Sequence, residues 1–423
     1  MKKFLLICIF ILNFMLIYSS DFIPALDLNA GGTYSYLPGS SGTEPNNSFG
    51  FESGMAGSFM ANTDFLPYIW FIPTFTLDYS NTAQPLNIDD ERFLFSQWLD
   101  IYLSYGINWQ LNDNWELKLR GFYRKDYSQQ TKDEKFGSGL YDYIDSGFYI
   151  ENVNKFQYYY IPIETTLGFK YIDRRFPNYK TLLSDLPSEV SEYKASPNTY
   201  TKEKDNLTYA FYIDNYLQWG QDSNWFTKLS FSYDYIPYFE QKVIDIDGSL
   251  SDAVRIDRYS TLSLSVPYYA TDVSGIEFGY DFTYKLTNQN YLDTMGTSSD
   301  FSDDKYIENY YNYYEHLLKF SINYEFPYKL LTAYKPVATI GLSLDIIQYG
   351  TRLAKNKEGK YKSEKEQDNN YTLSLNIKQN IMEFWSYYIT AAYTKYNSNM
   401  QWEAYSIYNY SYLTVIVGTA MSF

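Results

Sequence analysis

Short stretches of this chain alternate between apolar and polar residues, which is the period of a β-strand whose two faces meet different surroundings. Between Trp115 and Tyr123 the odd positions are Trp, Leu, Leu, Gly and Tyr, and the even positions are Glu, Lys, Arg and Phe. Residues 225–235, 277–284 and 318–326 alternate in the same way, with Phe226 as an exception. One face of each predicted strand suits lipid and the other suits water, so the pattern predicts an all-β protein.

The connections between the predicted strands alternate in length, and this separates a membrane barrel from a soluble β-sandwich with the same period. Barrels of bacterial outer membranes join their strands by short periplasmic turns and long outer loops. The short connections, several of them rich in the turn residues Asn, Asp, Ser or Gly, lie near residues 62–67, 111–114, 221–224, 270–275, 327–335 and 382–386. The long polar connections lie near residues 37–48, 80–96, 127–139, 173–205, 239–256, 288–312, 351–369 and 397–408.

Strand direction then fixes the number of strands. These hairpins give about 15 strands, but the directions do not match between the turns at 111–114 and 221–224 unless one more strand is present. A weak strand at Leu140–Ile150, closed by a turn at Glu151–Lys155, restores the order. The sequence therefore predicts an antiparallel up-and-down barrel of about 16 strands, an even number that leaves both termini in the periplasm.

The first 20 residues have the layout of a secretory signal peptide. Lys2 and Lys3 precede an apolar run from Phe4 to Tyr18, which Ser19 and Ser20 follow. We expect residues 1–20 to be removed and residues 21–423 to form one barrel domain. Beyond residue 20 no apolar run is long enough for a membrane-spanning helix. The only cysteine, Cys8, lies in this signal, so the mature chain has no thiol for a disulfide or a metal.

Composition narrows the possible partners. The formal net charge is −16, which disfavours nucleic acid, because duplex binding requires a basic surface.

Aromatic residues make up 21% of the chain, more than an ordinary core consumes. Tryptophans cluster at the predicted short turns, where a ring at the membrane boundary accommodates both its apolar body and its N–H. The predicted girdle consists of Trp109, Trp115, Trp219, Trp225 and Trp385. Tryptophans that cover hairpin ends in a soluble protein would give the same placement.

The chain ends in an alternating strand. Leu413, Val415, Val417, Thr419, Met421 and Phe423 share one face of it. A terminal Phe on such a strand resembles the signal that the barrel-assembly machinery reads in outer-membrane proteins, and the wider architecture resembles porin-like barrels without indicating a subfamily. The resemblance implies that Phe423 acts as an assembly signal, that the barrel lies in outer-membrane lipid, and that a homotrimer is possible.

A barrel of about 16 strands is wide enough to hold an aqueous channel, whereas about 8 strands would be packed shut. The first strand is expected near Leu26, which leaves no room for a preceding plug or periplasmic domain. The residues with inward parity that we expect to line a pore are Lys118, Arg120, Arg124, Asp100, Asp214, Asp234, Asp281 and Glu325. Basic residues facing acidic ones across a narrow lumen would sort charged solutes. The alternative is that these charges only neutralise one another along a wet wall.

Three long connections carry candidate chemistry. Arg174 and Arg175 could narrow the pore or hold a carboxylate or phosphate, but an ordinary exposed loop is the preferred interpretation. Asp300, Asp303, Asp304 and Glu308 are possible Ca²⁺ ligands, but their spacing matches no EF-hand, and we predict no metal site. The mixed lysines and glutamates of residues 351–369 read as a solvated, mobile surface loop.

Catalysis has little support in the sequence. His316 is the only histidine, and its parity matches Leu318 and Phe320, so it should point toward lipid or the outer interface. No phosphate loop, nucleophile elbow or histidine metal motif is present. We therefore expect no enzyme and no cofactor.

Two functions remain open. The first is a porin-like channel for passive diffusion of small hydrophilic solutes, preferring cations. The second is a surface adhesin or structural barrel that acts through its long loops. A secreted soluble β-sandwich is disfavoured, because many lipid-suited faces would remain exposed.

Overall fold

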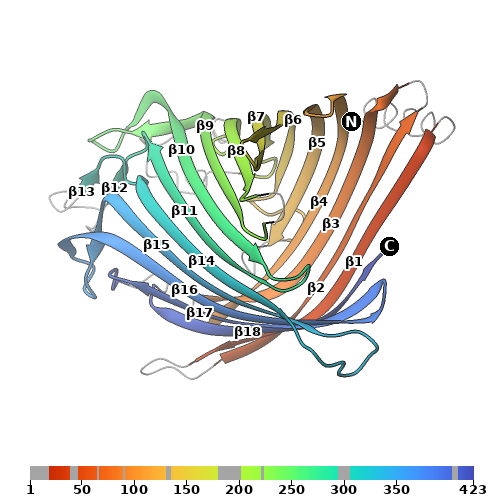
Figure 1. The fold of residues 1–423 in the computed structure, drawn as a ribbon. Helices are drawn as coiled ribbons and strands as arrows, with labels where there is room; N and C mark the ends of the chain where they lie inside the picture. Colours follow the sequence, from red (N-terminus) through yellow and green to blue (C-terminus); the bar gives the residue numbers. More distant parts are fainter. Residues whose placement is uncertain are drawn as a thin grey trace.

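A closed, antiparallel β-barrel of 16 strands forms the body of the protein, as the strand pattern predicts (Figure 1). The computed structural model describes residues 19–38, 46–63, 66–88, 91–129, 135–179, 202–220, 223–293, 305–402 and 408–423. Residues 1–18 of the predicted signal peptide lie outside this described part, and the first strand begins at Ser19.

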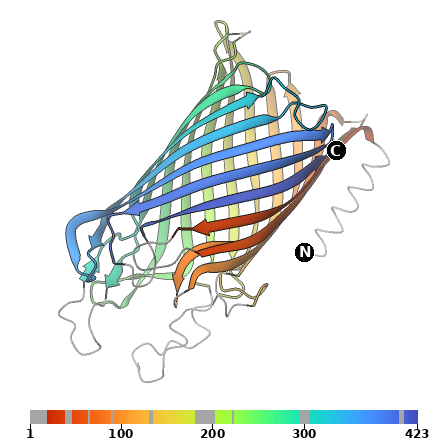
Figure 2. The ribbon, with the colours of Figure 1, turned by 90° about the horizontal axis from the view of Figure 1, so that it is seen from below.

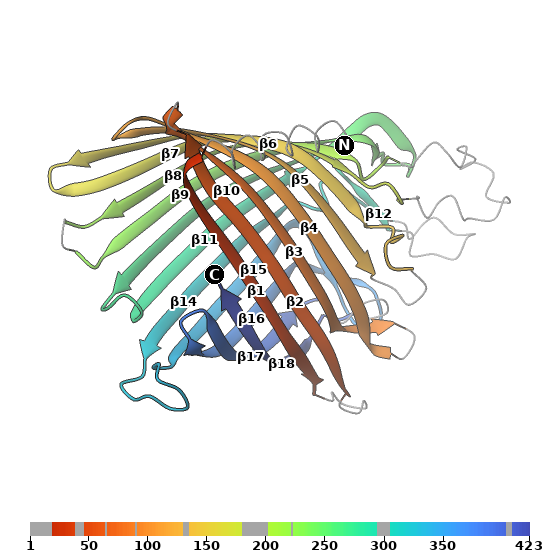
Figure 3. The ribbon, with the colours of Figure 1, turned by 90° about the vertical axis from the view of Figure 1, so that its right-hand side faces the viewer.

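The strands run obliquely around the wall in chain order (Figure 3). The first half consists of β1 (Ser19–Leu37), β2 (Asn46–Thr63), β3 (Leu66–Ile88), β4 (Glu91–Asn112), β5 (Trp115–Gln129), β6 (Tyr143–Tyr158), β7 (Ile161–Arg175) and β8 (Asn206–Gln218). The second half consists of β9 (Phe226–Ile244), β10 (Leu250–Tyr269), β11 (Gly275–Thr287), β14 (Tyr313–Glu325), β15 (Val337–Lys355), β16 (Tyr361–Met382), β17 (Trp385–Ser398) and β18 (Tyr410–Ser422). A separate two-stranded sheet pairs β12 (Tyr291–Asp293) with β13 (Lys305–Ile307).

The barrel closes where β1 pairs with β18 over residues 27–36 and 413–422. Phe423 completes this seam, because its backbone N–H donates to the Leu26 carbonyl at 2.8 Å and its carbonyl accepts from the Leu26 N–H at 3.0 Å. Its ring stacks on Phe384 at 5.3 Å between centroids. Every strand of the barrel thus has two neighbours, so the sheet presents no open edge to lipid.

The short connections gather at the end of the barrel that carries Ser19 and Phe423 (Figure 2). One predicted turn is wrong. Residues 151–155 belong to β6, and the turn follows at Tyr159 and Tyr160, with Tyr159 in the left-handed region at φ 54°. The polar run that suggested a turn is fully paired on both sides, for example Val153 with Glu116 and with Thr166. The extra strand that parity required is nevertheless present.

At the opposite end, several connections predicted as long loops are extended hairpins. β15 and β16 continue to Lys355 and Tyr361, so the expected mobile loop at 351–369 is wrong. The regions 80–96 and 239–256 likewise contain strand beyond the apolar belt. Their sequences lack a regular apolar face, because none is required beyond the apolar belt, while the backbone pairing continues.

The segment between β11 and β14 fills a gap in this extended rim. β11 and β14 end at Thr287 and Tyr313, whereas their neighbours continue further (Figure 1). The segment carrying β12 and β13 bonds to one neighbouring hairpin, as in the Asn290 amide that donates to the Ile244 carbonyl at 2.8 Å. β12 and β13 therefore extend the wall above the two shorter strands.

The outward faces are apolar, as the alternation predicts. Exposed side chains include Leu119 on β5, Phe231 on β9, Phe278 on β11, Leu342 on β15 and Val417 on β18. Such a continuous apolar face is unfavourable in water and suits the hydrocarbon region of a bilayer. No helix within the described ranges is long and apolar enough to cross a membrane.

The inward faces are polar and do not form an apolar core. The one cluster of buried hydrophobic residues among those described centres on Leu37, against which Tyr410 and Tyr412 pack. The inward residues of β10 and β16 instead include Ser263, Ser265, Thr372 and Ser374. The barrel thus encloses a polar lumen between walls that are apolar on the outside.

Candidate functional site on the lumenal wall

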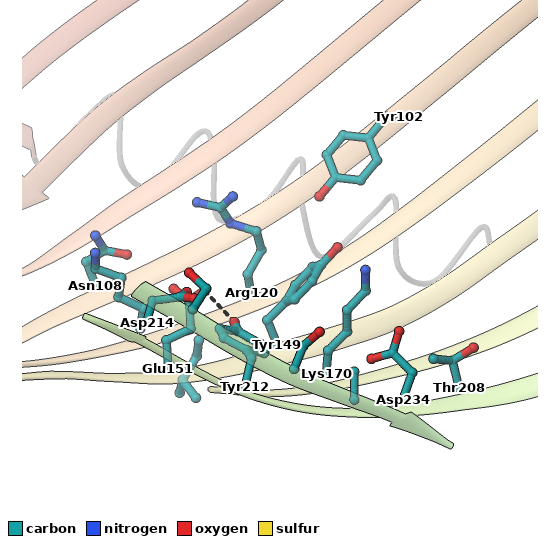
Figure 4. A pocket seen from close by; sticks show the side chains of 15 residues that line it. Tyr102, Asn108, Arg120, Tyr149, Glu151, Lys170, Thr208, Tyr212, Asp214 and Asp234 are labelled. Carbon is teal, nitrogen blue, oxygen red and sulfur yellow. Dashed lines mark hydrogen bonds between the residues drawn. The ribbon is translucent and has the colours of Figure 1, made fainter. Parts of the chain in front are cut away.

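Strands β5 to β9 place lumen-facing side chains in two parallel rows, because directly opposed residues of neighbouring strands share a face. The first row is Arg120, Tyr149, Lys170, Ala210 and Asp234. The second row is Lys118, Glu151, Gly168, Tyr212 and Ser232. Together they bring basic, acidic and phenolic groups from five strands onto one patch of wall (Figure 4).

These two rows line a recess of about 550 Å³, hereafter the β4–β9 recess. The other residues of its lining are Tyr102 and Asn108 of β4, Leu119 of β5, Thr208 and Asp214 of β8, and Ser230 of β9. Small residues make the wall hollow at its centre, where Ala210 stands between two charged residues of its row. Gly168 is required for a close approach, since a Cβ there would lie 2.0 Å from Cζ of Tyr212. The Tyr212 ring therefore lies over the backbone of β7.

Hydrogen bonds hold part of this lining in place. The Tyr212 hydroxyl donates to Oε1 of Glu151 at 2.6 Å, and Nζ of Lys170 lies 5.1 Å from the Tyr149 ring centroid. Among the described residues, Arg120, Lys170, Asp214 and Asp234 form no ion pair within 4.0 Å. The recess thus holds charges of both signs that the protein does not neutralise by direct contact.

The recess collects four residues predicted to line a pore, namely Lys118, Arg120, Asp214 and Asp234. The other four lie elsewhere on the wall, each in an ion pair. Nε of Arg124 bonds Oδ1 of Asp100 at 2.7 Å, Asp281 pairs with Lys319 at 2.5 Å, and Glu325 pairs with Lys335 at 2.8 Å. In these pairs the charges meet between neighbours on one wall rather than across the lumen.

A second cavity of about 420 Å³ lies on the adjoining part of the wall, from β9 to β16, and shares Ser230 with the β4–β9 recess. Serines, threonines and glycines dominate its lining, with Lys228, Glu277, Asp281 and Lys319 as its charged groups. Ser265 donates to Glu277 at 2.5 Å. Three of the four charged groups of this cavity, Glu277, Asp281 and Lys319, therefore already have partners.

The two adjacent arginines are not in an exposed loop. Arg174 is the last but one residue of β7 and bonds both carboxylate oxygens of Asp145 at 2.8 Å, with its guanidinium 4.2 Å from the Tyr143 ring centroid. Arg175 points to the other face, where it pairs with Asp173 at 2.5 Å and Asp205 at 3.3 Å. Both guanidinium groups are thus occupied by carboxylates of the chain itself.

Sequence reasoning did not single out Lys170, Glu151 or Tyr212 as members of a site. The inward parity of Glu151 is visible only when β6 is known to continue through residues 151–155, whereas Tyr212 shares the inward parity of Asp214 on β8 and was therefore an available signal. The alternation of Thr166, Gly168 and Lys170 with apolar neighbours was an available signal for β7.

The tryptophans of the predicted girdle lie beside the short turns. Trp109, Trp115, Trp219 and Trp225 are exposed. Nε1 of Trp385 donates to the hydroxyl of Thr419 at 2.5 Å, and Nε1 of Trp219 donates to Thr227 at 2.8 Å. Exposed rings whose N–H groups have partners suit a membrane boundary.

His316 lies on the outward face, as its parity predicts. Its Nδ1 lies 2.9 Å from the Tyr280 hydroxyl, and its ring packs against Phe282 at 5.1 Å between centroids. Within the described ranges, no group of three or more His, Cys, Asp or Glu is arranged to hold a metal ion. Asp300, Asp303 and Asp304 of the acidic loop lie outside the described residues.

A buried charge cluster fixes the extended rim outside the apolar belt. Asp293 of β12 pairs with Lys355 of β15 at 2.5 Å and accepts a hydrogen bond from the Tyr361 hydroxyl. Nearby, Nε of Arg352 lies 2.7 Å from Oε2 of Glu366, whose side chain is fully buried. Burial raises the pKa of Glu366 to about 7, against the opposing effect of Arg352. These contacts tie the β12–β13 segment to the β15–β16 hairpin.

Solved structures of outer-membrane proteins resemble this barrel at low sequence identity. OccAB3 of Acinetobacter baumannii gives a TM-score of 0.46 at 10% identity, over 95% of this chain and 99% of that chain. The anion-selective porin from Comamonas acidovorans gives 0.41 at 10%, over 95% and 100%, and OmpT of Vibrio cholerae gives 0.42 at 6%, over 95% and 97%. No family model and no curated protein matches the sequence.

The closed sheet and its apolar outer face decide the class. The chain is an integral β-barrel protein of the outer-membrane type.

Proposed function

We propose that this barrel is a channel for passive diffusion of small hydrophilic solutes across the outer membrane. The observation that carries the proposal is the polar inner face of a closed 16-stranded barrel. A barrel of this size is too wide for side chains to fill, and the described interior lacks an apolar core that could close it. The two wall cavities of about 550 and 420 Å³ are consistent with a wet lumen.

Liposome swelling tests the channel directly. Vesicles containing the refolded protein should swell in isotonic solutions of small sugars, at rates that fall with increasing sugar size. Vesicles prepared with an unrelated, plugged barrel provide the baseline. Swelling no faster than this baseline would contradict the proposal.

We further propose a preference for cations. Three carboxylates of the β14–β16 wall, Glu315, Asp345 and Asp368, form no ion pair with a described residue and lie on neighbouring strands. Acidic groups grouped on one wall attract cations into a lumen. The protein's net charge of −16 acts in the same direction.

The reversal potential under a salt gradient measures this preference. The triple variant Glu315→Gln, Asp345→Asn and Asp368→Asn should move the reversal potential toward zero. Asp247→Asn, in the turn between β9 and β10, removes a carboxylate far from this wall and should leave it unchanged. An anion-selective wild-type channel would contradict the preference without contradicting the channel.

The proposed orientation places both termini in the periplasm and the extended hairpins outside the cell. The supporting observation is that Ser19 and Phe423 share the end with short turns, which in outer-membrane barrels faces the periplasm. Protease added to intact cells should cleave the hairpin turn at 356–360 and spare an epitope tag inserted in the short turn at 383–384. Cleavage of that tag would contradict the orientation.

Assembly and quaternary structure complete the proposal. We propose that the barrel-assembly machinery reads the strand ending at Phe423, and that the barrel is able to form a homotrimer. We assign no catalytic residue, because His316 is turned to the outer face beside Tyr280 and away from the lumen.

A further inference from the structure

We propose that the β4–β9 recess binds small zwitterions, solutes such as free α-amino acids that carry a carboxylate and an ammonium group together. This inference rests on the proposed channel function and names a class of solute for it. The cationic part of the site is Arg120 and Lys170, and the anionic part is Asp234 with Asp214.

The strand order separates the two kinds of charge. Lys170 of β7 and Asp234 of β9 stand in the same row, with Ala210 of β8 between them. Two strand spacings put their backbones about 10 Å apart. Ala210 fills little of that gap, and no ion pair closes it. A solute with both charges can therefore satisfy Lys170 and Asp234 at once (Figure 4).

Nearby ion pairs differ from Lys170 and Asp234, because their opposite charges are in direct contact. Arg124 and Asp100 sit on adjacent strands and bond at 2.7 Å, and Arg174 and Asp145 do the same at 2.8 Å. In these two pairs, opposite charges on adjacent strands neutralise each other. In the recess a small residue takes the intervening position, so the charges remain available to a solute.

The polar lining supplies the remaining contacts for a small solute. The hydroxyls of Thr208, Ser230 and Ser232 and the amide of Asn108 offer both donors and acceptors. Tyr212 is held flat over Gly168 by its bond to Glu151, which keeps the ring out of the space above Ala210. Apart from Leu119, Ala210 and the tyrosine rings, the side chains that line the recess are therefore polar.

Charge of both signs also makes the recess selective. A solute with only a carboxylate gains Arg120 and Lys170 but meets the field of Asp214 and Asp234, and a solute with only an amine meets the reverse situation. Discrimination by such unfavourable contacts is as effective as discrimination by favourable ones. A zwitterion alone is attracted at both ends.

Block of single-channel current measures binding in the intact protein. L-alanine should reduce the open-channel current at concentrations at least about tenfold lower than either lactate or ethylamine, since each charged hydrogen bond contributes about tenfold or more in affinity. Lys170→Gln and Asp234→Asn should each weaken block by L-alanine about tenfold or more. Asp234→Asn should in addition improve block by lactate, and Lys170→Gln should improve block by ethylamine.

Three further variants keep the test decisive. Lys319→Gln and Asp281→Asn make the same chemical changes in the other cavity and should leave block by L-alanine unchanged. The exchange Lys170→Asp with Asp234→Lys reverses both charges and should restore block by L-alanine relative to either single variant. Equal block by the three solutes, or single variants with wild-type block, would overturn the zwitterion site while leaving the channel intact. Absence of current in the wild-type protein would overturn the channel itself.

Discussion

Replacement of Gly168 by Ala tests how the β4–β9 recess is built. The added Cβ would lie 2.0 Å from Cζ and 2.3 Å from Cε2 of Tyr212, so the ring must move. These atoms are the far end of a side chain, and the backbone of β7 can stay in place. The displaced ring then loses the 2.6 Å bond from its hydroxyl to Glu151.

The size of the effect follows from two opposing contributions. A hydrogen bond to a charged acceptor stabilises by about 1.5–3 kcal/mol, and the lower half applies because the recess is open to water. Replacing Gly by Ala inside a strand increases the free energy of unfolding by about 0.5–1 kcal/mol. The variant should therefore lose about 1 kcal/mol of unfolding free energy. Gly121→Ala is the matched control, since a Cβ there meets no atom within 4 Å, and it should gain about 0.5–1 kcal/mol.

A double-mutant cycle with Tyr212→Phe isolates the hydrogen bond. Urea unfolding of the refolded protein in lipid vesicles gives the free energies of the wild type, the two single variants and the double variant. Because both single changes remove the same bond, the double variant should lose at least about 1 kcal/mol less than their sum. Strictly additive losses would refute the coupling of Gly168, Tyr212 and Glu151.

Three further predictions concern the seam and the rim. Deleting Phe423 removes both backbone bonds to Leu26 and the terminal ring, so the fraction inserted in the outer membrane should fall more than the amount exported, measured by fractionation. The raised pKa of Glu366, about 7 against 4.5, means that its stabilisation of the folded rim is complete below pH 4.5 and is lost as pH rises through about 7. Protease cleavage at 356–360 should therefore increase over this range and become independent of pH in Glu366→Gln. Asp293→Asn leaves buried Lys355 without its carboxylate, which should cost about 3 kcal/mol and raise hydrogen exchange in β12 and β13; unchanged exchange would contradict the structural role of the pair.

The alternation of apolar and polar residues was sufficient to predict the architecture within the membrane. Because lipid requires one apolar face, runs such as Leu318 to Phe326 alternate in a way that identifies a strand from the sequence alone. The strand order, the even strand number and the outward direction of His316 follow from the same requirement.

Beyond the membrane no apolar face is required, so the alternation that identifies a strand is absent. The charged run around Glu366 resembles a mobile loop, yet backbone pairing extends through it and Arg352 accompanies the carboxylate into a buried position. The polar run Glu151–Lys155 was mistaken for a turn for the same reason, since inward and rim positions are equally hydrophilic.

For the candidate site, the sequence predicted which charged side chains face the lumen but not how they are grouped. Parity assigned Lys118, Arg120, Asp214 and Asp234 to the lumen but did not show which residues of neighbouring strands lie opposite one another. The register between strands decides that Arg124 meets a carboxylate while Arg120 does not. Long-range pairing of this kind has no local trace in the sequence.

Single-channel recording in planar bilayers tests the central claim most directly. A water-filled 16-stranded barrel should give discrete current steps, and added neutral sugars should reduce the step size only while they are small enough to enter. Purified, correctly folded protein that inserts into the bilayer but gives no steps would contradict the account of this barrel as an open channel.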